Sequence, residues 1–190
     1  MARDHATLDI HASGEDVTET THCIGLAAQV AADCRVLVLG SMPGVASLQA
    51  AQYYAHPRNR FWPLMAALTG IDVAQPYAAR MQALQSAGVG VWDVIGACER
   101  RGSLDTAIVR GSEVPNALPE LIAQLPQLAA VACNGATAHA AFVRYIQPLL
   151  GARVTSLAVW ALPSTSPANA AWPLPRLQAA WQPLADVLAG

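Results

Sequence analysis

The sequence predicts an α/β fold, a three-layer αβα sandwich around a mostly parallel four-stranded sheet. Segments with strand and helix patterns alternate along the chain, which favours a parallel sheet covered by helices on both sides. Two segments, 35–39 and 89–95, contain the apolar runs VLVL and VGVWDVI, as expected of strands buried on both faces. The 190 residues suffice for one domain with a substantial core and are too few for two.

The first half of the chain begins with a polar segment. Residues 1–22 carry turn-forming, acidic and threonine residues without a helical or strand period. We therefore expect a flexible extension there and a single domain over 23–190. A short helix is predicted at 24–32, ahead of the first strand. Apolar residues then recur with helical spacing across 61–68, and 77–86 is predicted as a further helix.

The second half alternates in the same way after the strand at 89–95, which ends in a polar loop. The remaining predicted elements are a helix capped by Asn116, a strand at 128–133, a helix at 136–146, a strand at 154–162 and a helix at 175–188. Four strands and the intervening helices therefore complete the predicted sandwich.

Composition says little about partners. The formal net charge is −2 and only 13% of the residues are charged, which is not the basic signature of a protein that depends on nonspecific phosphate attraction. A local group of arginines can still bind nucleic acid where the overall charge does not favour it.

Cysteine and histidine usage favours a reduced protein without a metal. The four cysteines form no CxxC pair and the five histidines show no metal-ligand spacing, so we expect buried free thiols and no metal site. The N-terminus lacks the apolar region of a signal peptide, and no apolar run approaches the roughly 18 residues of a membrane span. These features predict a cytoplasmic protein with no membrane contact.

The polar loops all fall at the carboxyl ends of the predicted strands. They are 40–44, the segment from Asp93 onward, Asn134–Gly135 and 163–169. Ligands of open parallel sheets bind at that edge. The sequence therefore predicts a binding site on one rim of the sheet.

Five motifs at this rim resemble the uracil-DNA glycosylase superfamily. They are GSMPG at 40–44, YYAHPRNRFW at 53–62, VWDVIGACERRGSLD at 91–105, CNG at 133–135 and LPSTSPAN at 162–169. The resemblance covers residues 35 to 185 and is nearest to the hypoxanthine-DNA (deoxyinosine) glycosylase branch, also called family 6. The mismatch-specific uracil/thymine glycosylases carry a related HPxNRFW element.

The resemblance implies two catalytic asparagines. Such an enzyme takes a nucleotide out of the duplex and breaks its glycosidic bond, which requires a placed water and stabilisation of the departing base. The resemblance assigns Asn59 to orienting the water and Asn134 to reading the base and supporting its departure. Asn59 could instead cap the helix that follows it, and Asn134 could be an Asn-Gly turn residue.

The resemblance also implies a base pocket. Tyr54 is expected to stack on the everted base, although Tyr53 could take that place or both could cover the sheet edge. His56 could contact the base or a phosphate, or serve a structural role. The remaining pocket residues form the first wall, where backbone can approach a ligand closely: Gly40, Ser41, Met42, Pro43 and Gly44.

A DNA-binding surface is expected beside that pocket. The resemblance places a wedge and phosphate contacts in the loop after the fourth strand, at Ser164, Thr165, Ser166, Pro167 and Asn169. Four arginines in the motifs are candidates for neutralising phosphates, or else solvated surface charges: Arg58, Arg60, Arg100 and Arg101.

Departures from the family pattern favour the hypoxanthine branch. Met42 stands where better-known branches place an Asp or Asn, and Leu162 precedes Pro-Ser where classical members carry a histidine. No lysine in the motifs can form a Schiff base. We therefore expect a monomeric, cofactor-free, monofunctional glycosylase acting on DNA with deaminated bases. The alternatives are a uracil or G:U/G:T mismatch-specific glycosylase, or a non-catalytic DNA- or nucleotide-binding domain.

Overall fold

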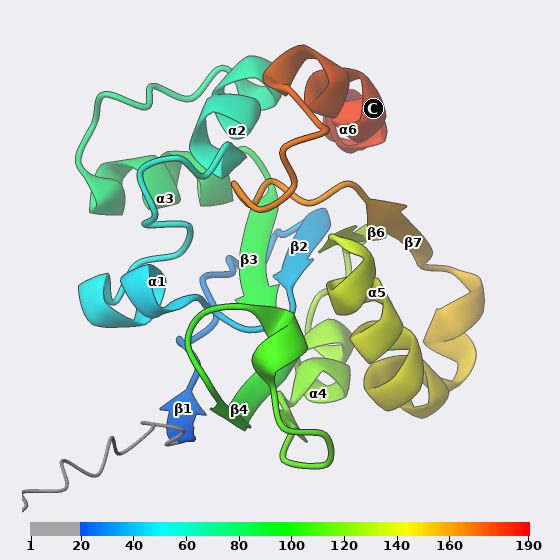
Figure 1. Cartoon of the computed structure of the whole chain (residues 1–190). Helices are drawn as coiled ribbons and strands as arrows, with labels where there is room; N and C mark the ends of the chain where they lie inside the picture. Colours follow the sequence, from blue (N-terminus) through cyan, green and yellow to red (C-terminus); the bar gives the residue numbers. More distant parts are fainter. Residues whose placement is uncertain (1–19) are drawn as a thin grey trace, which may run out of the picture.

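The computed structural model describes residues 20–190, and a four-stranded parallel sheet forms its centre (Figure 1). The strands are β2 (Val36–Gly40), β3 (Val89–Asp93), β6 (Ala130–Asn134) and β7 (Ala158–Leu162), in the order β3-β2-β6-β7. Each neighbouring pair is parallel. The predicted fold class, with its four-stranded parallel sheet, is confirmed.

One face of the sheet is covered by three helices. Val36 and Val38 of β2 point to this face and pack with buried residues of α2 (Phe61–Thr69), α3 (Tyr77–Ser86) and α6 (Leu174–Ala189). In Figure 1 these helices lie above the sheet and to its left. The alternating side chains of a strand allow β2 to serve two cores at once.

The opposite face is covered by α4 (Leu118–Ala123) and α5 (Ala136–Ala141), the latter continued by one π-helical turn at Phe142–Ile146. Leu37 and Leu39 of β2 point to this face and are fully buried. The two cores on either side of the sheet complete the three-layer sandwich that the sequence predicts.

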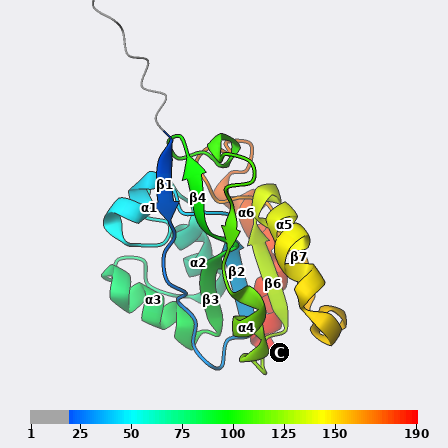
Figure 2. The same ribbon diagram turned by 90° about the horizontal axis from the view of Figure 1, so that it is seen from below.

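A second, antiparallel sheet adjoins the end of β3. It consists of β1 (Thr21–Ile24), β4 (Ile95–Arg100) and β5 (Val114–Pro115), in the order β1-β4-β5. Figure 2 shows β4 and β1 together beyond the central sheet. The chain passes from β3 into β4 through Val94, so the predicted strand at 89–95 divides in two, and the start of the predicted polar loop, 98–100, belongs to β4.

The helix predicted at 24–32 is wrong. Its backbone is instead paired to two strands. Gly25 N–H donates to the Gly96 carbonyl of β4 (2.7 Å), which continues the pairing of β1 with β4, and Gln29 exchanges two 2.9 Å hydrogen bonds with Val91 of β3. Since β3 is an edge strand of the central sheet, Gln29 supplies partners for edge groups that need them. Of the predicted 1–22 extension, residues 1–19 lie outside the described residues, and Thr21 begins β1.

Three smaller differences separate the predicted elements from the observed ones. A helix not predicted, α1 (Val45–Ala50), follows β2. Asn116 does not cap α4, because its Nδ2 donates to the Asp93 carbonyl (2.9 Å) and ties the two sheets together. The fourth strand begins only at residue 158, since 151–155 forms a 3₁₀ turn.

Within residues 20–190 no helix has the length and apolar character that crossing a bilayer requires.

Candidate active site

A cavity of about 720 Å³ opens at the carboxyl end of the central sheet. Gly40, Asp93 and Asn134 end three adjacent strands and all line it, together with the loop after β7. The chain leaves β2 toward β3 on one side and later returns to β6 on the other. The cavity therefore lies where the strand order reverses, the usual ligand position in such sheets.

The cavity brings together nearly all of the residues that the sequence predicts for a site. Of the predicted residues, only the four arginines lie outside its lining: Arg58, Arg60, Arg100 and Arg101. Those that line it are Gly40, Ser41, Met42, Pro43, Gly44, Tyr54, His56, Asn59, Asn134, Ser164, Thr165, Ser166, Pro167 and Asn169.

Two glycines allow the walls to come close. A Cβ at Gly40 would lie 2.3 Å from Oδ1 of Asp93, so a side chain there would displace that carboxyl group. Gly135 has φ +111°, and a Cβ there would lie 3.0 Å from the Cβ of Ser164. Glycine at these positions therefore sets the shape of the cavity floor and of one wall.

Asn59 lines the cavity and also contacts the start of α2. Its Oδ1 accepts the Phe61 N–H (3.0 Å) at the start of α2, which also fixes the orientation of the amide. Its own N–H donates to the His56 carbonyl (2.8 Å). The amide Nδ2 makes no hydrogen bond within the described part of the chain, so a rigid side chain presents a donor at the cavity.

Asn134 is held at both ends of its amide by one residue. Its Oδ1 accepts the Thr165 N–H (2.9 Å) and its Nδ2 donates to Thr165 Oγ1 (3.0 Å). Thr165 is fully buried. This pair therefore joins the end of β6 to the loop after β7, and Thr165 differs from the prediction because its side chain is not available to a phosphate.

The Arg60 side chain holds the loop after β7 in place. Its guanidinium donates to the carbonyls of Asn169 (3.0 Å), Ser166 and Trp172, and its backbone N–H donates to the Thr165 carbonyl (3.1 Å). In Figure 1 the orange segment between β7 and α6 accordingly runs beside the start of α2. These bonds commit most of the guanidinium donors of Arg60 to the loop, although the residue remains partly exposed.

The other arginines divide between surface and core. Arg58 and Arg101 are exposed. Arg100 is fully buried and donates to the Pro43 carbonyl (2.7 Å), which corrects its prediction as a phosphate contact. A charge is normally kept out of the interior unless it is paired, and sequence spacing gave no sign that Arg100 differs from Arg101.

The two tyrosines are now distinguishable. Tyr53 is buried, and its hydroxyl donates to the carbonyls of Leu26 and Ala27 (3.2 Å each). Tyr54 stacks on Phe61, with ring centroids 3.8 Å apart and 19° between the planes. Its backbone has φ +57°, a costly conformation for a bulky residue. Both tyrosines line the cavity, and Tyr54, the more exposed of the two, remains the one expected to stack on a base.

Met42 and His56 contribute to the cavity in different ways. The Met42 side chain packs into a small core with Cys23, Ile95 and Cys98, so it helps to fix the first wall. His56 Nδ1 accepts the Arg58 N–H (3.1 Å). A neutral His56 therefore carries its proton on Nε2, which is the nitrogen free to donate.

Two aspartates at the cavity were not predicted as site residues. Asp93 is 4% exposed, and burial, followed by the negative charge of Asp105, raises its pKa to about 7. Burial also raises the pKa of Asp105, which accepts the Ser41 hydroxyl at 2.6 Å. An acidic residue that directly ends the apolar strand VGVWD was the available signal for Asp93.

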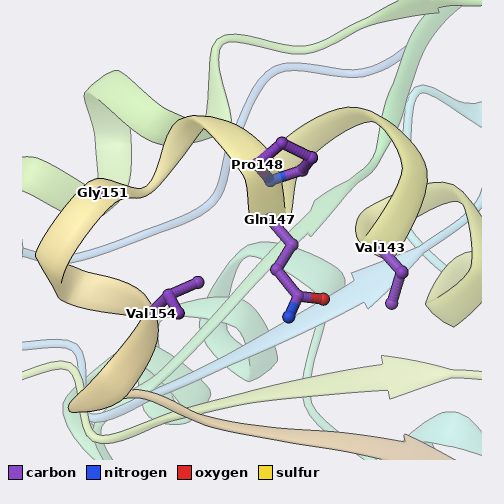
Figure 3. A pocket seen from close by; sticks show the side chains of 5 residues that line it. All are labelled: Val143, Gln147, Pro148, Gly151 and Val154. Atoms are coloured by element: carbon purple, nitrogen blue, oxygen red, sulfur yellow. The ribbon is translucent and has the colours of Figure 1, made fainter.

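A second hollow, of about 440 Å³, lies away from the strand ends (Figure 3). It is lined by Val143, Gln147, Pro148, Gly151 and Val154, none of which can titrate. Its lining offers no acid, base or nucleophile. The chemistry of the described residues therefore belongs at the carboxyl edge of the sheet.

The fold and the cavity define an α/β protein that binds its ligand at the switch point of a parallel sheet, among amides and backbone groups. A sequence model of the Uracil DNA glycosylase superfamily matches residues 27–187. The chain belongs to this superfamily, as the five motifs predict.

Relatives support the same placement. A protein of Methanosarcina acetivorans named Hypoxanthine DNA glycosylase is 33% identical over 146 residues, 76% of this chain and 87% of that protein. A protein of the same name from Methanosarcina barkeri is 40% identical over 101 residues, 53% of this chain and 63% of that protein. A solution NMR structure from M. acetivorans, described provisionally as a uracil DNA glycosylase, has a TM-score of 0.74 and 29% identity over 90% of this chain and all of its own.

Proposed function

We propose that this protein is a monofunctional DNA glycosylase that everts deoxyinosine from DNA, hydrolyses its N-glycosidic bond and leaves an abasic site. The observation that carries the proposal is that Asn59 and Asn134, from different loops, line one cavity. The volume of about 720 Å³ lies within the roughly 300–1,000 Å³ of ligand sites. The relatives named Hypoxanthine DNA glycosylase support hypoxanthine as the base.

In the proposed mechanism, Asn59 serves the attacking water. Glycosidic cleavage passes through an oxocarbenium-like sugar, so the bond to the base is largely broken before water attacks. An amide cannot act as a true general base, but it can hold water with the second lone pair of Oδ1, the first being bound to the Phe61 N–H. Its unbonded Nδ2 donates toward developing negative charge.

Asn134 and Tyr54 hold the base. Thr165 fixes the Asn134 amide, which leaves one N–H and one lone pair for the edge of the base. Tyr54, backed by Phe61, offers a stacking surface, and such stacking is worth about 1–3 kcal/mol per base. Eversion costs a few kcal/mol, so these contacts offset much of it.

The loop at 164–169 and the exposed Arg58 and Arg101 contact the DNA backbone and the gap left by the base. Arg60 supports this loop from within instead of contacting a phosphate. We further propose that the protein acts as a monomer in the cytoplasm. The sequence contains no lysine, which supports hydrolysis without a lysine Schiff base.

The test is base release from duplexes that carry inosine, uracil or xanthine, with Asn59→Ala as control. Release of hypoxanthine by the wild-type protein, well above the variant, supports the proposal. Release of uracil alone would favour a uracil or mismatch-specific enzyme. Tight binding to lesion or abasic duplex without any release under excess protein would favour a non-catalytic DNA-binding domain.

A further inference from the structure

Asp93 is a buried carboxyl group with an unused oxygen at the floor of the cavity. It ends β3, is 4% exposed and lines the cavity opposite Gly40, whose missing side chain makes room for it. Its Oδ2 is buried and has no hydrogen-bond partner among residues 20–190. Buried polar atoms in native proteins are nearly always bonded, so an unpaired one beside a cavity indicates a ligand contact.

The groups that face Asp93 do not satisfy it. The Tyr53 hydroxyl acts on Asp93 as a hydrogen-bonding group and opposes the rise of its pKa, but it also donates to the Leu26 and Ala27 carbonyls and leaves Oδ2 of Asp93 unpaired. The buried Tyr54 hydroxyl has no hydrogen-bond partner within residues 20–190. Asp105 is itself acidic and accepts the Ser41 hydroxyl. Arg100 donates to the Pro43 carbonyl, and no ion pair joins it to either aspartate in this part of the chain.

This environment disfavours a negative charge on Asp93. Burial raises the pKa of Asp93 to about 7, with the charge of Asp105 as the next largest cause, while Tyr53 and Arg100 act in the opposite direction. Burial, and then the charge of Asp93, also raises the pKa of Tyr54, which stays neutral. The cavity therefore has a neutral carboxylic acid available near neutral pH.

We propose that Asp93 takes part in base release as a neutral carboxylic acid, with its O–H donating a hydrogen bond to an acceptor atom of the departing oxo-purine. The inference rests on the proposed glycosylase function and adds a specific group that touches the base. The departing base carries negative charge on its oxygen and ring nitrogens. A neutral donor stabilises that charge, and hydrogen bonds to an ionised acceptor are about twice as strong as neutral ones.

The ionised form has the opposite effect. A carboxylate at the cavity floor would repel the departing base and offers no donor. Release should therefore be fast while Asp93 is protonated and should slow as pH rises through its pKa. A carboxylic acid kept neutral by an apolar site so that it can donate is a known arrangement in enzymes.

The experiment measures single-turnover release of hypoxanthine from an inosine duplex, with protein in excess, between about pH 5.5 and about pH 9. Wild-type release should fall by about tenfold per pH unit above the pKa of Asp93. Asp93→Asn keeps the shape and an N–H donor but cannot titrate, so this descending limb should disappear. Asp105→Asn removes a nearby negative charge, so its limb should begin at a lower pH than in wild type.

Duplex binding and thermal unfolding, measured at each pH, separate these effects from binding and folding. The inference is overturned if wild-type protein releases hypoxanthine without the descending limb, or if Asp93→Asn retains it. Should Asp93→Asn not fold, an unmoved limb in Asp105→Asn overturns the inference on its own. Failure of the proposed function looks different: wild type would then release no hypoxanthine at any pH.

Discussion

The two asparagines of the cavity have the same side chain but differ in how many of its amide atoms are hydrogen-bonded within the protein. Asn59 uses only its oxygen, at the start of α2, and keeps its amide nitrogen free. Asn134 uses both ends of its amide on Thr165. The comparison teaches that Asn59 can offer its whole amide N–H₂ group to the substrate, whereas Asn134 offers the base only the N–H and lone pair that Thr165 leaves free, and also holds a wall of the site in place.

Asn59 should show the largest effect on rate. Asn59→Ala should reduce single-turnover base release by about 10²–10³-fold, the usual cost of removing one stabilising donor. It should also cost about 1 kcal/mol of stability through the lost contact at the helix start. Fluorescence-monitored unfolding and base-release rates measure the two losses separately.

Asn59→Asp is the matched control for that prediction. The aspartate oxygen still accepts the Phe61 N–H, and a negative charge is favoured at a helix N-terminus, so the variant should be as stable as wild type. It keeps an oxygen for the attacking water but lacks the N–H donor, so its rate should lie between those of Asn59→Ala and wild type. Wild-type rates in both variants would show that Asn59 is only a helix cap.

Asn134 should couple to Thr165 in a double-mutant cycle. Asn134→Ala leaves the buried Thr165 N–H unpaired, which should cost about 1–3 kcal/mol, and Thr165→Val should cost about 1 kcal/mol. Both should slow base release. Because they act through one contact, the double variant should lose less than the sum of the two. Strict additivity in both stability and rate would contradict the clamp.

Arg60 and Arg58, two residues apart, should separate loop support from DNA contact. Arg60→Gln removes several hydrogen bonds to the 164–172 segment and should cost about 2–3 kcal/mol, seen as a lower denaturant midpoint. Arg58→Gln should leave stability unchanged, weaken DNA binding and lower the salt slope of log K by about 1. A salt-dependent binding defect confined to Arg60→Gln would reverse these assignments.

Asp93 differs from both asparagines because it titrates. Its pKa in the folded protein, about 7, lies above the usual 3.8, so the folded state binds the proton more tightly. Stability should therefore be lost as pH rises from about 4 to about 7 and stay level above that. Asp93→Asn lacks this loss. The Tm of Asp93→Asn minus that of wild type should therefore rise by several degrees between pH 5 and pH 8, at roughly 2–4 °C per kcal/mol. A Tm difference that does not change with pH would contradict a raised pKa at Asp93.

The sequence predicted the fold through features that are local. The run VLVL and the helical spacing at 61–68 are set by burial on fixed faces, so pattern reading found β2 and α2. The strand at 95–100 and the paired segment at 24–32 depend on partners far along the chain, which no local pattern records. Backbone pairing with distant segments therefore determines the structure of these two segments, which local propensity could not predict.

The candidate site shows the same division. Residues carried by motifs at strand ends converged on one cavity, because parallel strands bring their ends together. Side-chain partners were not predictable: Arg60 turned inward to the 164–172 segment, and Arg100 is buried while Arg101 is exposed. The importance of Asp93 likewise arises from burial, which becomes visible only when Asp105 and Tyr54 are placed around it.

The most direct measurement of the central claim is product analysis after wild-type protein has acted on an inosine-containing duplex. Free hypoxanthine is quantified by chromatography, and strand cleavage is assayed with and without alkali. A monofunctional hydrolase should yield free hypoxanthine and alkali-sensitive abasic sites in equal amounts, with the strand intact before alkali. Absence of free hypoxanthine, or strands already broken without alkali, would contradict the account.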